Sequence, residues 1–450
     1  AADLGWDVTL IDPRERPGGV CLYEGCIPSK TLLHVARLLH ETDEAADWGI
    51  HYEQPKIDLN ALREYSDRVI GKLTKGLSGL SKQRRVNYLQ GKARFEDSHH
   101  LTIEHNGDEQ RITFNHCIIA TGSRPMTIPD LAIDSPRVMD STQALKLEDI
   151  PEKMLVIGGG YIGLEMASVY AALGAKVTVV EMTSGLLPGV DRDLVQVLHK
   201  HLETELAQIH LDTKVTALAA TNDGIRATIT NEESSEDTFD KVLIAVGRRP
   251  NSDDLGLDQT KVKVTDKGFI EVDGQRRTTD EHIYAIGHVA GEPMLAHKAT
   301  HEGHVAAEAI AGKPTAYDPA AIPAVVFTDP EIAWCGLSES QAKERGMNIR
   351  IAKFPWAASG RAATIDRPDG LTKLILQPRT ERILGVGIVG VGAGELIGEA
   401  TLAVEAGLNA ADLRLTIHAH PTLSETVMES AEVFFGQSSH YRARHGQPKG

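Results

Sequence analysis

Residues 154–181 constrain the fold of this chain more than any other segment. An apolar stretch at 154–157 runs into the glycine-rich turn 158–163, and a helical pattern then leads to a β-branched stretch that ends at Glu181. A strand, a glycine turn, a helix and a second strand in this order form the nucleotide-binding unit of doubly wound sheets. The glycines let the backbone approach a pyrophosphate, and the helix N-terminus turns its amide groups toward that anion. The residues predicted to form this dinucleotide turn are Gly158, Gly160, Ile162 and Gly163.

Glu181 indicates which dinucleotide binds. A carboxylate at the end of the second strand accepts hydrogen bonds from both hydroxyls of the adenosine ribose. Its negative charge also repels a 2′-phosphate. We therefore predict NAD rather than NADP.

Two internal echoes suggest a second dinucleotide domain. Residues 2–12 parallel residues 171–181, and residues 118–125 match residues 243–250 in the same order. By the first parallel, residue 1 falls inside a helix. We therefore expect a first strand and glycine loop to precede the sequence, which would make it a fragment at its N-terminus.

Composition excludes several classes of protein. The chain has 450 residues and a formal net charge of −16, which argues against nucleic acid as a partner because phosphate binding needs a basic footprint. No run approaches the roughly 18 apolar residues of a membrane-spanning helix. Four cysteines are too few for a disulfide framework, so the reducing cytoplasm is the expected location. Cys117 begins the apolar run 117–120 and Cys335 follows Trp334, so both are predicted to be small core residues.

Cys21 and Cys26 stand apart from the other cysteines because they flank the start of a predicted helix. In a regular helix their Cα atoms would lie about 8.7 Å apart, whereas a disulfide needs about 4.4–6.8 Å. The pair can bridge only across an irregular turn, which Gly25 and Pro28 would permit. A helix N-terminus also lowers the pKa of a thiol. By spacing alone, two unreactive buried thiols remain an alternative.

The segment 18–30 resembles the active-site signature of pyridine nucleotide–disulfide oxidoreductases, and the resemblance extends over essentially the whole chain. It implies that Cys21 exchanges with substrate thiols and that Cys26 lies under a flavin. It also implies an α/β fold with two Rossmann-like dinucleotide-binding domains and a C-terminal α+β dimerisation domain. The predicted domains are an FAD-binding domain at 1–125 completed by a central segment at 251–320, an NAD-binding domain at 126–250 and a dimerisation domain at 321–450.

The same resemblance assigns residues to the two cofactors. Asp12 holds the ribose-binding place of the FAD unit, where the family usually has Glu, and Lys30 with Glu165 resembles the ion pair near flavin N5. A first-turn helix acid that complements the helix dipole is the alternative for Glu165. The further FAD contacts are Gly18, Gly19, Val20, Ala93, Thr121, Gly122, Ser123 and Ala296, and the further NAD contacts are Val215, Ala245 and Gly247.

His288 departs from the family pattern. It follows the strand and turn at 283–287, at the place where relatives carry an aspartate that binds a ribityl hydroxyl. A histidine can still donate or accept a hydrogen bond, but it is larger and differs in charge. We therefore expect weakened FAD binding.

His420 and Glu425 have two interpretations. Thr422 and Glu425 have the spacing of a helix capping box, so both could be purely structural. Alternatively, Glu425 orients the His420 imidazole and stabilises its protonated form. The residues alone favour neither alternative. The resemblance implies the second, with the His420–Glu425 pair supplied by the partner subunit of a homodimer. No metal site is expected, although His297, His301 and His304 share a predicted helix.

Two further stretches, 292–299 and 354–362, resemble the lipoamide-oxidising branch of the family. The implied activity is oxidation of protein-bound dihydrolipoamide with reduction of NAD. The implied partners are the lipoyl domains of 2-oxo acid dehydrogenase or glycine cleavage complexes. A reductase of another disulfide is one alternative. An inactive paralogue that binds lipoyl domains is a second alternative, motivated by His288 and the absent first loop.

Overall fold

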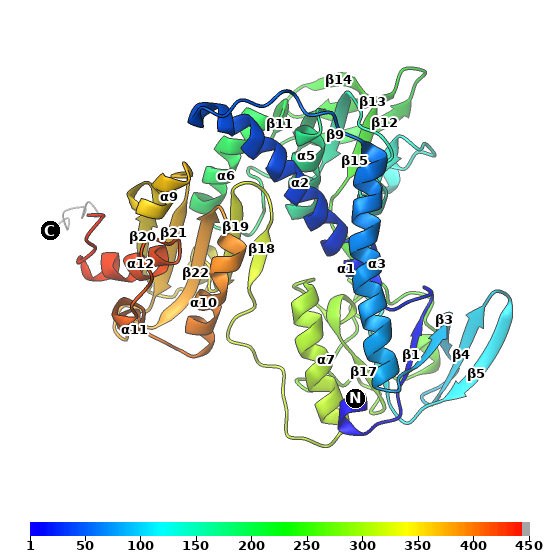
Figure 1. Cartoon of the computed structure of the whole chain (residues 1–450). Coiled ribbons are helices and arrows are strands. Elements are labelled where there is room, and N and C mark those ends of the chain that lie inside the picture. Colours follow the sequence, from blue (N-terminus) through cyan, green and yellow to red (C-terminus); the bar gives the residue numbers. More distant parts are fainter. Residues whose placement is uncertain (443–450) are drawn as a thin grey trace.

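The computed structural model describes residues 1–442, so residues 443–450 of the predicted dimerisation domain lie outside it. Figure 1 shows three sheet-containing regions joined by the long helices α2 and α3 and by an extended connection from α7 to β18. Among the described residues, no helix is both long and apolar enough to cross a membrane.

The predicted NAD-binding domain contains a five-stranded sheet in the order β11-β10-β9-β15-β8, with every pairing parallel. An antiparallel β12-β13-β14 sheet lies beside it. The elements are β8 (Val138–Met139), α4 (Ser141–Ala144), β9 (Lys153–Ile157), α5 (Tyr161–Ala172), β10 (Lys176–Val180), α6 (Arg192–Glu205), β11 (Gln208–His210), β12 (Lys214–Ala220), β13 (Ile225–Thr230), β14 (Ser234–Phe239), β15 (Lys241–Ile244) and β16 (Arg248–Pro250).

The predicted FAD-binding domain repeats this plan in two separate parallel pairs, β1-β2 and β17-β6, beside an antiparallel β3-β4-β5 meander. The pairing of β17 with β6 brings the central segment onto the N-terminal part of the chain. The elements are β1 (Thr9–Asp12), α1 (Gly19–Glu24), α2 (Cys26–Glu44), α3 (Leu59–Gln83), β2 (Asn87–Gln90), β3 (Lys92–Phe95), β4 (His100–His105), β5 (Asp108–Thr113), β6 (Cys117–Ile119), β7 (Ser123–Pro125), β17 (Ile283–Ala285), η5 (Gly287–Ala290) and α7 (Ala296–Ile310).

The predicted dimerisation domain is an antiparallel sheet in the order β18-β19-β22-β21-β20 with helices packed on it. The elements are β18 (Ala324–Val326), β19 (Glu331–Gly336), α8 (Glu339–Glu344), β20 (Arg350–Pro355), α9 (Gly360–Thr364), β21 (Leu371–Leu376), β22 (Ile383–Gly390), α10 (Ala393–Glu405), α11 (Ala410–Leu415) and α12 (Glu425–Phe435). The predicted fold class, α/β with a C-terminal α+β domain, is therefore confirmed.

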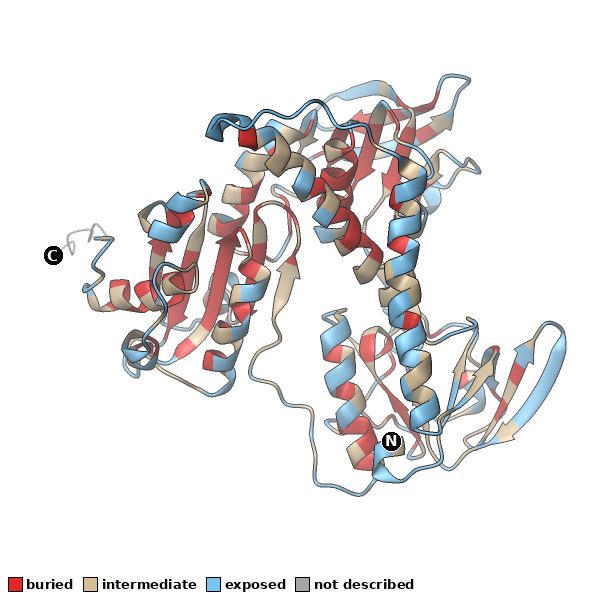
Figure 2. Ribbon diagram, in the orientation of Figure 1, coloured by how far each residue is buried: buried red, intermediate tan, exposed pale blue. Residues whose placement is uncertain are grey.

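Burial explains how the site is held. Figure 2 shows buried residues gathered in the NAD-domain and dimerisation sheets. Helix α5 is apolar on all sides and is buried along most of its length, as expected for a helix covered on every face. Leu32 of α2 and Ile332 of β19 belong to the same apolar cluster as α5. Helix α2, which begins at Cys26, is thus fixed against two domains.

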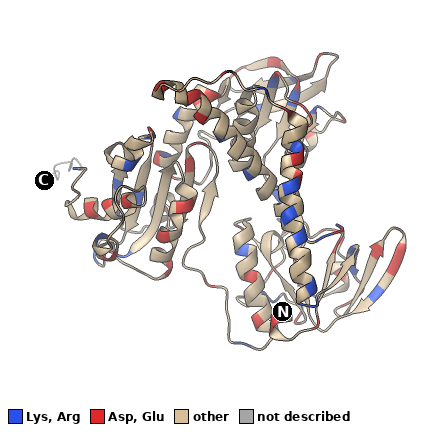
Figure 3. Ribbon diagram, in the orientation of Figure 1, with Lys and Arg blue, Asp and Glu red and all other residues tan. Residues whose placement is uncertain are grey.

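Charged side chains avoid these buried sheets. Figure 3 shows lysines, arginines and acids of both signs along the helices and loops, while the central strands are mostly uncharged. Lys373 on β21 is an exception, because its side chain is 0 % exposed. A buried charge is costly unless it is paired, so Lys373 needs acidic partners close to its ammonium group.

Candidate active site

The cysteine pair lies where two helices meet. Cys21 is in α1, Gly25 breaks the helix with φ −146° and ψ −113°, and Cys26 is the first residue of α2. This is the irregular turn that the spacing of the pair requires. Both cysteines are free thiols, and their side chains are in hydrogen-bond contact.

The two thiols have opposite proton affinities. The hydrogen bond that Cys21 donates lowers the pKa of Cys26 to about 6, with the Lys30 charge assisting and burial opposing. The same hydrogen bond and burial raise the pKa of Cys21 above its ordinary range. Cys26 also stands at the N-terminus of the long helix α2, where a negative charge is favoured. At neutral pH the pair therefore holds one proton, on Cys21, and one negative charge, on Cys26.

Lys30 ties the cysteine helix to the NAD-domain helix α5. Its Nζ donates to both carboxylate oxygens of Glu165, at 3.0 and 2.8 Å. The Phe327 amide donates to the same carboxylate at 3.1 Å, and the Phe327 ring centroid lies 4.6 Å from the lysine nitrogen. The Glu165 side chain is only 4 % exposed. Its partners are thus Lys30 and Phe327, and no sequence pattern pointed to Phe327.

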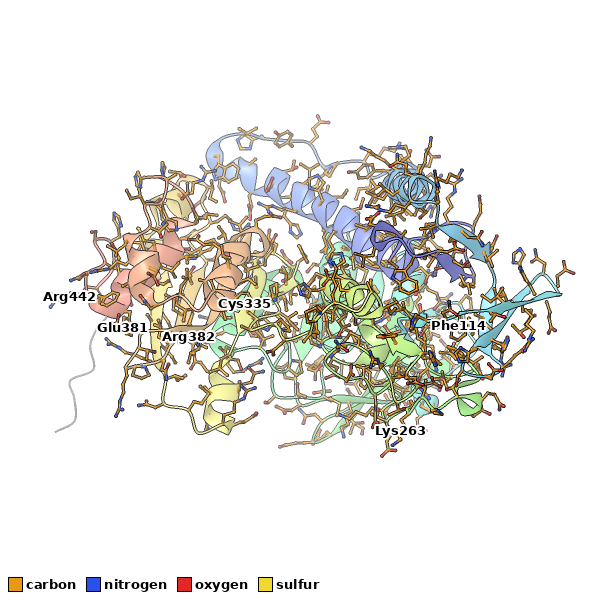
Figure 4. The ribbon with its side chains drawn as sticks, turned by 90° about the horizontal axis from the view of Figure 1, so that it is seen from below. Phe114, Lys263, Cys335, Glu381, Arg382 and Arg442 are labelled. Carbon is orange, nitrogen blue, oxygen red and sulfur yellow. The ribbon has the colours of Figure 1, made fainter. Side chains whose placement is uncertain are left out.

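The other two cysteines differ from the pair. Burial raises the pKa of Cys117 to about 12 and that of Cys335 to about 11. Figure 4 shows Cys335 in the dimerisation region, away from Phe114 and Lys263 of the predicted FAD-binding region. Neither thiol has the environment that produces a reactive thiolate.

The glycine turn at 158–163 is shaped by close backbone packing. A β-carbon added at Gly158, which has φ +111°, would lie 2.5 Å from the carbonyl oxygen of Ala245. One added at Gly163 would lie 2.1 Å from the Gly158 oxygen. At Gly160, the N-cap of α5, a β-carbon would meet no atom within 4 Å. The turn thus combines tight packing with open space at a helix N-terminus, as a pyrophosphate site requires.

Glu181 follows β10 directly and is anchored by three donors. Its carboxylate accepts from the Gly159 amide at 2.7 Å and from the Thr183 amide and hydroxyl at 2.8 and 2.7 Å. A carboxylate has about four lone-pair positions. With three of these positions occupied, the ribose hydroxyls predicted to bind Glu181 would have to share the remaining lone-pair position. Val215 lies on β12, and Gly247 precedes β16 with φ +130°.

The residues predicted to contact FAD lie around the start of α1 and the end of β6. Asp12 ends β1, and its carboxylate accepts the Arg14 amide at 2.8 Å. Gly18 is the N-cap of α1, which Gly19 and Val20 begin. Gly19 and Gly122 have positive φ, and β-carbons there would meet no atom within 4 Å. This open space fits a cofactor that approaches the backbone. Ala93 lies on β3, and Ala296 begins α7.

His288 occupies a hydrogen-bonded position in η5. Its Nδ1 lies 2.8 Å from the Ser123 hydroxyl, which in turn accepts from Arg248 Nε at 2.8 Å. Burial, with the nearby Arg248 and Lys298 charges, lowers the pKa of His288 to about 4. The ring is therefore neutral, and its Nδ1 shares one hydrogen bond with the Ser123 hydroxyl. Arg248 was missed from the sequence, although it lies in the second internal echo.

His420 and Glu425 form a pair in the dimerisation region. The His420 Nδ1 lies 2.9 Å from a Glu425 oxygen, and the Thr422 amide donates to the other oxygen at 2.8 Å. Burial tends to raise the pKa of Glu425, but the hydrogen bonds from Thr422 and His420 outweigh it, so the pKa is lowered. Glu425 begins α12 after the N-cap Ser424. Half of the expected capping box is present, because the Thr422 amide donates to Glu425, but the helix starts at Glu425, later than the motif predicts.

The two halves of the predicted catalytic machinery are far apart within one chain. Helix α12 lies at the outer side of the dimerisation region, whereas α1 lies near the centre of the molecule (Figure 1). The His420 side chain is 69 % exposed. Its ring is thus available to another molecule rather than to the cysteines of its own chain.

Comparisons with known proteins agree with this arrangement. A family model described as "Pyridine nucleotide-disulphide oxidoreductase" matches residues 1–303, and the dimerisation domain of the same family matches residues 322–431. The dihydrolipoyl dehydrogenase of Haemophilus influenzae is 48 % identical over 97 % of this chain and 91 % of its own length. That of Geobacillus stearothermophilus is 43 % identical over 98 % of this chain and 93 % of its own length.

Solved structures give the same result for the fold. LpdA from Mycobacterium tuberculosis has a TM-score of 0.88 at 26 % identity, covering 95 % of this chain and 93 % of that one. The flavoprotein disulfide reductase RclA from Escherichia coli has a TM-score of 0.84 at 29 % identity, covering 95 % of this chain and 94 % of that one.

Proposed function

The chain belongs to the pyridine nucleotide-disulphide oxidoreductase family, and on that premise we propose that it oxidises protein-bound dihydrolipoamide and reduces NAD. The observation that carries the proposal is the contact between Cys21 and Cys26 across the helix break, with a thiolate on Cys26. Relatives named dihydrolipoyl dehydrogenase, at 43–48 % identity over nearly the whole chain, support this choice of substrate.

FAD and NAD are the cofactors of this oxidoreductase. We assign NAD to the turn at 158–163, where the space beside Gly160 is open, and FAD to the region around Gly19, Gly122 and the Lys30–Glu165 pair. Bound FAD would carry two electrons from the thiol pair to NAD. Overall, the dithiol loses two electrons and two protons. NAD accepts both electrons and one proton as hydride, and the second proton goes to solvent.

The cysteines perform the thiol chemistry. In the oxidised pair, a substrate thiolate attacks the Cys21 sulfur, the Cys21–Cys26 bond breaks, and Cys26 leaves as a thiolate. Its lowered pKa makes Cys26 a good leaving group. The second substrate thiolate then attacks the substrate sulfur of the mixed disulfide and releases Cys21, which completes the cyclic disulfide of oxidised lipoamide. Covalent exchange divides one redox step into two easier ones.

His420 is the base in this proposal. Its Nε2 accepts the proton of a substrate thiol, while Glu425 holds Nδ1 and stabilises the imidazolium that forms. The match to the dimerisation domain supports a homodimer. We propose that the exposed His420 of each chain serves the cysteine pair of the other. Lipoyl domains of 2-oxo acid dehydrogenase or glycine cleavage complexes are the proposed partners, in the cytoplasm.

A steady-state comparison of substrates tests the proposal. NADH formation from dihydrolipoamide and NAD should exceed by far any NADH-dependent reduction of glutathione disulfide or mercuric ion. No turnover of dihydrolipoamide by flavin-loaded protein would refute the proposed substrate. Reduction of another disulfide under the same conditions would instead establish the alternative reductase.

A further inference from the structure

The loop 182–190, here called the ribose loop, follows Glu181 and leads into α6. Its first part supports the Glu181 carboxylate through Thr183. Its middle part is bonded to the glycine turn, because the Leu187 amide donates to the Gly159 oxygen at 2.9 Å. The position of the acid that faces the ribose therefore depends on how this loop is held.

Arg192, the first residue of α6, holds the ribose loop through hydrogen bonds to its carbonyl groups. Its guanidinium donates to the carbonyl oxygens of Leu186 at 2.8 Å, Leu187 at 2.6 Å and Val190 at 2.7 and 3.0 Å. Burial lowers the pKa of Arg192. A planar fork with several fixed donors suits this task, and a lysine cannot reproduce it.

Lys373 fastens the start of α6 to the dimerisation sheet. Its Nζ lies 2.6 Å from Asp191, 2.7 Å from Asp193 and 2.9 Å from Glu339. The Glu339 amide also donates to Asp191 at 3.0 Å. Burial tends to lower the pKa of Lys373, but the three carboxylates outweigh it and the pKa is raised. The buried lysine is thus a fixed positive charge.

Side chains are closely packed at this junction. Helix α6 lies between the NAD-domain sheet and the dimerisation sheet in Figure 1. A β-carbon added at Gly387 of β22 would lie 2.6 Å from a Leu194 methyl group. Only about 10 Å³ of free space remains among the side chains around Val190, Leu194 and Trp334, which is room for about one water molecule.

We propose that Arg192 and Lys373 are positioning residues for NAD. Arg192 fixes the ribose loop, and Lys373 fixes the helix start that carries Arg192, so that the Glu181 carboxylate keeps its place at the ribose. The NAD site is thereby fastened to the dimerisation domain through one buried charge. This inference rests on NAD binding at Glu181, as in the proposed function. Because its donors face carbonyl groups, Arg192 is not free to bind a 2′-phosphate, which agrees with NAD rather than NADP.

The experiment compares two variants with a matched control. Arg192→Lys keeps the charge but loses the fork, and Lys373→Met removes the buried charge. Lys353→Met is the control, because Lys353 contacts the same Asp193 and Glu339 but is 42 % exposed. The dissociation constant of NADH is measured by NADH fluorescence on the flavin-loaded dimer, whose flavin and cysteine pair are fully reduced beforehand so that NADH has no electron acceptor. KM for NAD and for dihydrolipoamide is measured alongside.

We expect Arg192→Lys and Lys373→Met to weaken NADH binding about tenfold, the usual scale for a lost supporting contact. KM for NAD should rise in parallel while KM for dihydrolipoamide stays constant, and Lys353→Met should change NADH binding less than about twofold. If Arg192→Lys binds NADH like the wild type, the proposal is overturned, even if Lys373→Met fails to fold. If the wild type itself binds no NADH, the proposed function fails instead.

Discussion

The sharpest consequence of the structure concerns the thiolate of Cys26. Its pKa of about 6, against an ordinary 9.0, corresponds to about 4 kcal/mol in favour of the charged form. The hydrogen bond from Cys21 is the largest cause. A hydrogen bond to a charged group contributes about 1.5–3 kcal/mol, which corresponds to a shift of about one to two pKa units. Cys21→Ala should therefore raise the pKa of Cys26 to about 7–8.

Ultraviolet thiolate absorbance across the pH range measures this change. At pH 7, the thiolate fraction of Cys26 should fall from about nine-tenths to between about half and a tenth. A Cys21→Ala/Cys26→Ala double variant supplies the baseline. Cys21→Ser is the matched control, because its hydroxyl still donates, and its Cys26 should titrate near 6. A Cys21→Ala protein that also titrates near 6 would refute the reasoning and assign the effect to Lys30 and the helix N-terminus.

Three further predictions concern Lys30, Glu425 and His288. Lys30→Met strands the buried Glu165 carboxylate with the Phe327 amide, and urea unfolding should show a loss at the lower end of about 3–5 kcal/mol. Glu425→Gln should lower kcat by up to about 10²-fold. Because the pKa of Glu425 is lowered, its stabilising effect is complete above the ordinary carboxyl range. The stability difference from the Gln variant should vanish as pH falls through the lowered pKa. His288→Asp should slow FAD release during dialysis, and an unchanged rate would mean that the neutral His288 is a competent substitute.

The sequence predicted well those segments whose structure depends on local patterns. The strand, glycine turn and helix around Gly158 depend on neighbours a few residues apart, and the structure has them at the predicted positions. The irregular turn at Gly25 was predicted as the condition for a bridge, because a regular helix holds the two cysteines too far apart.

Contacts between segments far apart in the chain could not be predicted from sequence patterns. Lys30 and Glu165 are 135 residues apart, and only a family resemblance paired them. The partners of Lys373 arise from the packing of α6 against the dimerisation sheet, for which no local signal exists. The capping box is a local case. Glu425 accepts the Thr422 amide as expected and also contacts His420, but the helix starts later than the motif predicts.

The central claim is that Cys21 and Cys26 are the redox centre, and mass spectrometry of the peptide that contains both tests it most directly. Flavin-loaded protein treated with excess NAD and no thiol should yield a peptide that resists alkylation and is lighter by two hydrogens. After dihydrolipoamide is added, both cysteines should be alkylated, and a return to excess NAD should restore the disulfide. Two thiols that stay open to alkylation under all of these conditions would contradict the claim.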